Sequence, residues 1–112
     1  RGRVAMRRVE DEELAAPELI DVEAISTLRG LVLGRKLAVS RAELATRALA
    51  VLPIERYGHR GLVPRMWELR DNVTSYDAAY VALAEMLDIT LVTSDARLAA
   101  APGIRCSVEV LR

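Results

Sequence analysis

Acidic side chains stand at the edges of apolar segments at two places in the second half of the chain. Asp77 lies near the start of segment 76–87, and its neighbours at helical spacing are apolar, so its carboxylate would be desolvated there. Asp95 follows the apolar run 89–93, where ligands bind beyond the carboxyl ends of parallel strands. Each also has a purely structural explanation, because a helix N-terminus favours an anion and accepts aspartate as a cap. Each aspartate alone is therefore open to both interpretations.

A third carboxylate candidate lies in the predicted helix 21–33, which holds both Asp21 and Glu23. On a helical wheel Glu23 falls on a polar face and Asp21 on an apolar one. Periodicity alone would single out Asp21, unless Asp21 is simply the N-cap. The pattern leaves both residues open.

Carboxylates that converge repel one another unless a cation lies among them. Mg²⁺ prefers oxygen ligands and keeps several waters, and such acidic clusters orient water for phosphodiester hydrolysis. The chain has one cysteine, Cys106, and one histidine, His59, which excludes the usual Cys/His metal sites. The residues therefore favour chemistry with a hard cation, in which no side chain has to act as the nucleophile.

The elements that must position these residues alternate between helix and strand in the second half, which predicts a small α/β domain with a mostly parallel sheet. The spacing of Ser40 and Glu43 predicts a capping box at the start of one helix. Apolar periodicity, breakers and alternation predict helices over 1–13, 21–33, 40–52, 62–69, 76–87 and 95–101, and strands over 54–57, 89–93 and 104–110.

The 112 residues correspond to one domain, and 16 basic residues balance 16 acidic ones, so global charge does not indicate a nucleic-acid binder. We find no pattern of a membrane span or signal peptide, and the cysteine content fits a cytoplasmic protein. Three strands are few for a sheet, and the chain begins in mid-pattern at Arg1. We therefore expect a single domain over 1–112 that is truncated at its N-terminus and lacks its first strand, which would leave strand edges exposed.

Three segments resemble the acidic motifs of PIN-domain ribonucleases, close to the VapC-type toxins of bacterial toxin–antitoxin pairs. Segment 67–84, WELRDNVTSYDAAYVALA, resembles the third motif. Segment 91–98, LVTSDARL, resembles the fourth, a strand that ends in Thr-x-Asp. Segment 16–24, APELIDVEA, resembles the second, in which a glutamate opens a helix. The three motifs follow in the family's order over essentially the whole chain.

The resemblance implies a PIN-like three-layer α/β/α domain and a Mg²⁺-dependent endoribonuclease, with Mn²⁺ as a substitute. It carries the catalytic and metal-ligating role onto Glu23, Asp77 and Asp95, and a supporting polar role onto Thr93. It also implies an RNA substrate, a small antitoxin protein as the neutralising partner, and a homodimer. The family's first motif, an aspartate on the first strand, has no counterpart in the chain, so we expect these 112 residues alone to cleave RNA poorly.

Two alternatives remain. The missing first aspartate would also fit a non-catalytic PIN-like module that acts in binding or assembly. A phosphoacceptor signalling domain is disfavoured because the only lysine, Lys36, does not follow an acceptor aspartate on a strand. Among the other residues, we expect Trp67 and Met66 to pack against the sheet, whereas the arginines that could line an RNA groove are by default a solvated face; they are Arg56, Arg60, Arg65 and Arg70.

Overall fold

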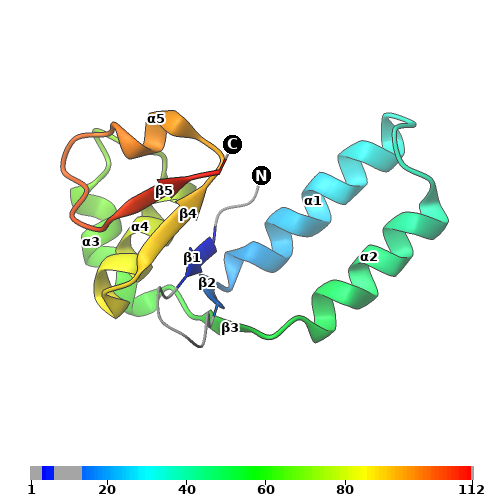
Figure 1. Cartoon of the computed structure of the whole chain (residues 1–112), viewed down its shortest axis with the longest axis horizontal. Helices are drawn as coiled ribbons and strands as arrows, with labels where there is room; N and C mark the ends of the chain where they lie inside the picture. Colours follow the sequence, from blue (N-terminus) through cyan, green and yellow to red (C-terminus); the bar gives the residue numbers. More distant parts are fainter. Residues whose placement is uncertain (1–3, 7–13, 112) are drawn as a thin grey trace. The chain divides into compact units, whose positions relative to one another are not determined.

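The computed structural model describes residues 4–6 and 14–111. Its contacts divide the chain into two compact units. The first, here called the sheet unit, consists of residues 1–18 and 54–112 and contains every strand (Figure 1). The second, here called the hairpin unit, consists of residues 19–53 and contains two helices. Asp77 and Asp95 belong to the sheet unit, and Glu23 belongs to the hairpin unit.

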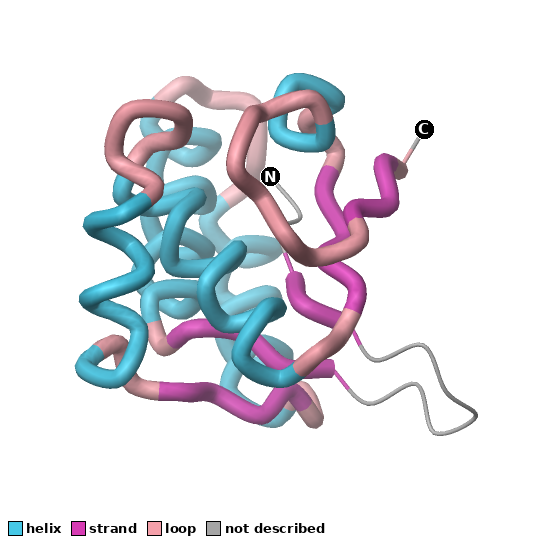
Figure 2. The backbone as a smooth tube through the Cα atoms, turned by 90° about the vertical axis from the view of Figure 1, so that its left-hand side faces the viewer, coloured by secondary structure: helices cyan, strands magenta, loops and turns pink. Residues whose placement is uncertain are grey.

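The sheet of the sheet unit has the strand order β3-β2-β1-β4-β5. β2 pairs with β3 and β4 with β5 in parallel, and β1 is antiparallel to both of its neighbours, β2 and β4. Four of the five strands therefore run in one direction, which confirms a mostly parallel α/β sheet. Figure 2 draws the strands in magenta and the helices in cyan. The strands are β1 (Val4–Met6), β2 (Leu14–Pro17), β3 (Ile54–Tyr57), β4 (Thr90–Thr93) and β5 (Val108–Val110).

The N-terminal part of the chain differs from the sequence prediction. The helix predicted over 1–13 is wrong at Val4–Met6, which form β1 in the middle of the sheet, and the rest of that range lies outside the described residues. The exposed edges expected beside a missing first strand are not found, because β1 pairs with both β2 and β4. β2 itself was not predicted, since its sequence Leu-Ala-Ala-Pro has little strand propensity. Pro17 is tolerated at its end because β1 pairs only with Leu14 and Ala15.

α4 (Ser75–Leu87) is the central helix of the sheet unit and packs against α3, β1, β2 and β4. Its residues 78–84 are all buried, which agrees with the predicted helix over 76–87 and with the apolar neighbours of Asp77. Four of these seven residues are alanines, whose small side chains let neighbouring elements approach closely, while Tyr80 and Leu83 supply volume. The helix ends at Asp88, whose left-handed backbone (φ +55°) lets the chain turn into β4.

α3 (Val63–Glu68) follows a short 3₁₀ turn, η1 (Arg60–Leu62), and has Pro64 in its first turn, as the sequence predicts. Trp67 on α3 is 66% exposed, so the prediction that it packs against the sheet is wrong. The residue that faces the core from this segment is Leu69, two positions later, which is 1% exposed. Because 3.6 residues complete a helical turn, positions 67 and 69 point to different sides.

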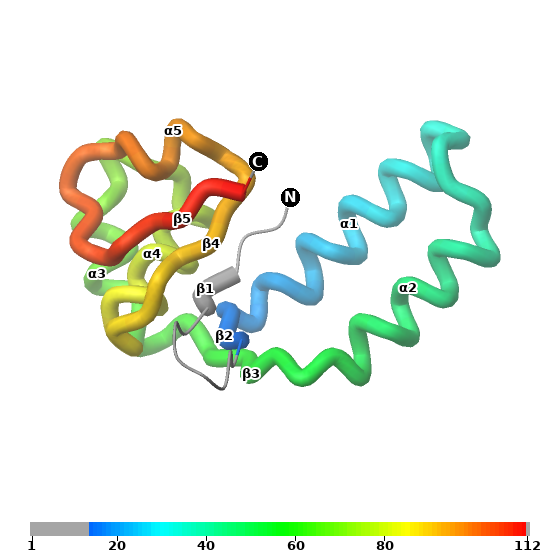
Figure 3. Tube along the Cα trace, in the orientation of Figure 1, coloured from blue at the N-terminus to red at the C-terminus, as the bar shows by residue number. Residues whose placement is uncertain are grey.

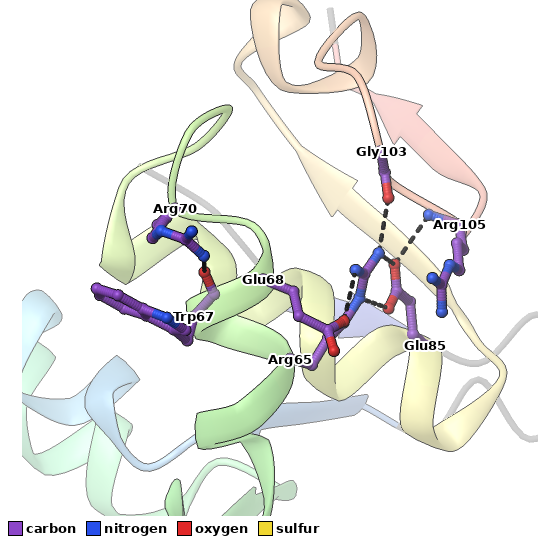
Figure 4. Close-up of polar contacts among 7 residues, drawn as sticks. All are labelled: Arg65, Trp67, Glu68, Arg70, Glu85, Gly103 and Arg105. Carbon is purple, nitrogen blue, oxygen red and sulfur yellow. Dashed lines mark hydrogen bonds and ion pairs between the residues drawn. The ribbon is translucent and has the colours of Figure 1, made fainter.

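A network of hydrogen bonds ties α3, α4 and the segment before β5 together (Figure 4). The Arg65 guanidinium donates to both carboxylate oxygens of Glu85, at 2.7 and 3.1 Å, and to the carbonyl oxygen of Gly103 at 2.6 Å. The backbone N–H of Arg105 donates to Glu85 Oε2 at 2.8 Å. The bidentate pair leaves the Arg65 and Glu85 side chains only 19% and 13% exposed. It therefore fixes the packing of α3 on α4 from one side.

In the hairpin unit, α1 (Leu19–Leu33) and α2 (Val39–Val51) are joined by a tight turn (Figure 3). The N–H of Lys36 donates to the carbonyl of Leu31 and that of Arg35 to Val32, which is a Schellman arrangement. Arg35 takes the left-handed position that glycine usually fills (φ +59°). The predicted capping box at Ser40 is wrong, because α2 already begins at Val39 and its cap is Ala38 in extended conformation.

Candidate functional site

Asp77 lies in the first turn of α4, the position where a helix N-terminus favours a negative charge. The helix is capped by Thr74, whose hydroxyl oxygen accepts the backbone N–H of Asp77 at 3.2 Å. One carboxylate oxygen of Asp77, Oδ1, is buried. Asp77 is therefore held on a fixed turn, with its charge partly withdrawn from water.

Asp95 follows β4 and is the N-cap of the four-residue helix α5 (Ala96–Ala99). Its Oδ1 accepts the backbone N–H of Arg97 at 2.9 Å, so the capping interpretation is correct for this residue. Its backbone N–H in turn donates to the hydroxyl oxygen of Thr93 at 3.1 Å. Thr93 is fully buried at the end of β4, so its hydroxyl holds the backbone of Asp95 in place. The Arg97 side chain also donates to both carboxylate oxygens of Asp95, at 3.3 and 3.5 Å.

The path of the chain brings Asp77 and Asp95 to the same end of the sheet unit. α4 and β4 pack against each other and are joined by only Asp88 and Ile89, so they run in opposite directions. Asp77 lies ten residues before the end of α4, roughly 15 Å at 1.5 Å per residue. Asp95 lies five residues beyond the start of β4, roughly 17 Å at 3.3 Å per residue. The two aspartates therefore lie at about the same distance from the turn that joins α4 and β4.

A carboxylate that the sequence analysis did not single out, Glu18, also belongs to this end. β2 runs parallel to β4, and Glu18 follows the last residue of β2. Its backbone N–H donates to the carbonyl of Tyr57, at the end of the neighbouring parallel strand β3. The signal that could have identified it is the one that identified Asp95, an acidic residue next to the carboxyl end of a strand, but β2 was not recognised as a strand.

Glu23 lies on the second turn of α1 in the hairpin unit. Both Glu23 and Asp21 are partly exposed, so exposure does not distinguish them and Glu23 stays a prediction. Within the described part of the sheet unit, no three side chains of the types His, Cys, Asp and Glu are close enough together to hold a metal ion. The candidate site in this unit therefore consists of Asp77 and Asp95, which lie at the same end of the sheet unit.

The groups at this end fit a hard cation in their chemistry. They are the carboxylate oxygens of Asp77 and Asp95, and the hydroxyl of the buried Thr93 holds the backbone of Asp95. Carboxylate oxygens are ligands that Mg²⁺ and Mn²⁺ prefer. The chain's only thiol does not offer an alternative nucleophile. Burial and the charge of Glu85 raise the pKa of the Cys106 thiol, so it stays protonated at neutral pH and is a weak nucleophile.

Comparisons with known proteins identify the family of the chain. The family model described as the PIN domain matches residues 1–104. Ribonuclease VapC1 of Mycobacterium tuberculosis is 47% identical over 98 residues, which cover 87% of this chain and 74% of the relative. VapC ribonuclease Mb0985 of Mycobacterium bovis is 38% identical over 107 residues, covering 96% and 84%. Ribonuclease VapC12 of M. tuberculosis is 33% identical over 110 residues, covering 98% and 85%.

The structure contains a mostly parallel sheet in an α/β fold, and the PIN-domain model matches nearly the whole length of the chain. The chain therefore belongs to the PIN-domain family. Within that family it is a ribonuclease of the VapC type, as the resemblance of its motifs predicts. The ribonucleases among the relatives favour the enzyme over the non-catalytic binding module. No helix in residues 4–6 and 14–111 has the length and apolar character that a membrane crossing requires.

Proposed function

We propose that the protein is a Mg²⁺-dependent endoribonuclease toxin whose metal is held by Asp77, Asp95 and Glu23. The observation that carries the proposal is the antiparallel packing of α4 and β4, which brings Asp77 and Asp95 to one end of the sheet unit. Two carboxylates at the same level repel each other, and a divalent cation between them removes that cost. The relatives supply the reaction class, and the oxygen-only donors supply the preference for a hard ion.

The chain's own residues would bind and orient. Asp77 is fixed by the first turn of α4 and Asp95 by its cap on α5. Thr93 is a positioning residue, because its buried hydroxyl holds the backbone of Asp95. The role of Glu23, on α1, rests on the resemblance of its motif alone. The bound metal would supply a water of lowered pKa and stabilise charge on the phosphate oxygens.

The metal requirement is tested by cleavage of an end-labelled RNA with Mg²⁺, with Mn²⁺ and with excess EDTA. We expect internal cuts with either metal, none with EDTA, and full recovery when Mg²⁺ is restored. Isothermal titration with Mn²⁺ should show binding that is lost in Asp95→Asn, a variant that keeps the cap because asparagine caps as well as aspartate. Undiminished cleavage in EDTA would exclude the proposed metal chemistry.

We further propose that the hairpin unit carries the contact surface for an antitoxin, for a second copy of the chain, or for both in turn. Among the described residues, thirteen large apolar side chains are exposed, and eight of them belong to this unit. An exposed apolar surface of this kind is typical of protein interfaces. The eight are Val22, Ile25, Leu31, Leu33, Val39, Leu44, Val51 and Leu52. Such an assembly would act in the cytoplasm, where the RNA and the antitoxin of a bacterial pair are found.

Association is predicted to depend on the apolar residues near the turn of the hairpin. Leu33 is 64% exposed and Leu31 is 37% exposed, while Val32 and Leu37 are partly exposed. We expect size-exclusion chromatography with light scattering to report a dimer or a complex for the parent, and a shift toward monomer for Leu33→Glu. Exchange of the exposed Thr27 for Glu, on the same helix, adds the same single negative charge and is the matched control. A parent that is a well-behaved monomer at all concentrations would contradict the prediction.

A further inference from the structure

The only tryptophan of the chain, Trp67, is exposed and yet its ring is held in place (Figure 4). The guanidinium carbon of Arg70 lies 4.5 Å from the centroid of the ring. Arg70 Nη1 also donates to the carbonyl oxygen of Trp67 at 2.9 Å, which fixes the guanidinium on that side. Arg70 covers one face of the ring, and Trp67 is still 66% exposed, so much of its surface is open to a ligand.

We propose that Trp67 and Arg70 form a subsite that stacks an unpaired base of the RNA substrate. This inference rests on the proposed function. It adds a second place at which the substrate is held, away from the bond that is cleaved. A flat aromatic face accepts any base, and an adjacent guanidinium contributes both cation–π interaction and attraction for phosphate. Arg70 has five N–H donors, and the bond to the Trp67 carbonyl uses one of them.

The position of α3 supports this assignment. α3 and α4 pack against each other and are joined by the short turn 69–74, so the C-terminal end of α3 adjoins the N-terminal end of α4. Backbone bonds from the N–H groups of Asn72 and Val73 to the carbonyl of Leu69 hold this turn. Trp67 and Arg70 therefore lie at the end of the sheet unit where Asp77 lies. A strand of RNA whose phosphate lies at the metal proposed to be held by Asp77 would have a neighbouring base near Trp67.

An RNA base fits this surface better than a protein partner does. A stable protein interface needs about 800 Å² from each side with an apolar centre. The large apolar residues that α3 exposes are only Val63 and Trp67, whereas the hairpin unit exposes eight. Arg60 lies in the turn before α3 and Arg70 follows its end, and both are exposed, so their positive charges complement a phosphate backbone.

The stacked pair offers a direct measurement, because the fluorescence of the parent comes from a single tryptophan. We would titrate the Asp77→Asn variant, which we expect to cleave RNA slowly, in excess EDTA, with a single-stranded RNA and with the same RNA annealed to its complement. Stacking should quench the fluorescence of Trp67 with the single strand and much less with the duplex. Quenching that is equal for both, or absent for both, would overturn the proposal.

Affinity for the single strand, measured by anisotropy of a dye-labelled RNA, should fall about 5- to 150-fold in Trp67→Ala. This range converts a stacking energy of about 1–3 kcal/mol at 1.4 kcal/mol per tenfold. Trp67→Phe should restore most of the affinity, since a smaller ring still stacks, and Met86→Ala, which removes another exposed apolar side chain, should leave affinity unchanged. A Trp67→Ala variant that binds RNA normally but fails to associate with protein would show that the surface is a protein interface and overturn the proposal.

The two proposals fail in distinguishable ways. If the parent cuts RNA with Mg²⁺ and Asp77→Asn does not, while Trp67→Ala binds and cuts like the parent, the base-stacking subsite is wrong and the proposed function stands. If the parent does not cut RNA with any divalent metal, the proposed function is wrong, whatever the fluorescence shows.

Discussion

Exchange of Asp77 for Asn is expected to lower the rate of RNA cleavage by about 100- to 1,000-fold, the loss that follows removal of one group that stabilises transition-state charge. The variant keeps the size of the side chain and removes only the charge and one metal-ligating oxygen. The N–H bond to Thr74 that caps α4 involves the backbone of residue 77, so it is retained. The measurement is single-turnover cleavage at saturating Mg²⁺, with thermal unfolding recorded for each variant.

The matched control is Asp88→Asn, which removes the same charge at the opposite end of α4. Asp88 has a left-handed backbone, which asparagine adopts readily, so the helix is not disturbed. We expect Asp88→Asn to cleave at nearly the parental rate. Similar losses in both variants would attribute the effect to net charge or folding, and a fully active Asp77→Asn would remove Asp77 from the site.

Glu85→Gln is expected to destabilise the protein by about 1–3 kcal/mol at pH 7, because it leaves the partly buried Arg65 without its bidentate partner. Burial alone would raise the pKa of the Glu85 carboxyl, but hydrogen bonds from the Arg65 side chain and the Arg105 backbone N–H outweigh it and hold this pKa below 4.5. The stabilisation from this pair is therefore fully present above the pKa that the carboxyl has in the unfolded chain. It is lost as the pH falls through the lower pKa that the carboxyl has in the folded protein.

The measurement is urea unfolding followed by circular dichroism at a series of pH values from 7 to 3. The difference in unfolding free energy between parent and Glu85→Gln should be constant near neutral pH and should shrink in acid. Glu68→Gln is the control, because Glu68 pairs with the same arginine at 3.2 Å but is 61% exposed. It should cost less than about 1 kcal/mol. A difference that grows as the pH falls would have the wrong sign for a lowered pKa.

Much of the sheet unit was predictable because its signals are local. The unbroken apolar sequence of α4 and the short apolar run of β4 predict a buried helix and a buried strand, whatever the rest of the fold. Asp77 and Asp95 are conspicuous for the same reason, since each lies at the edge of a segment that excludes charge. The β3 strand and the position of Pro64 in α3 were predicted by equally local rules.

Other features were not predictable because partners distant in the sequence decide them. Val4–Met6 has apolar residues that suit a helix or a strand, and pairing with both β2 and β4 makes it a strand. The capping box predicted at Ser40 does not form, because α2 already begins at Val39. The carbonyl of the extended Ala38 accepts the first hydrogen bond of this helix. Helical phase, rather than hydrophobicity, exposed Trp67 and buried Leu69.

The sequence by itself determined the fold class, the buried pair α4 and β4, and the identity of two candidate carboxylates, because burial periodicity and residue chemistry are properties of single segments. Only the tertiary structure decided that Asp77 and Asp95 come to one end, that Glu18 joins that end, and that Arg65 and Glu85 bind across α3 and α4. These relations depend on strand order and helix packing, which arise from the free energy of the whole fold rather than from any one segment.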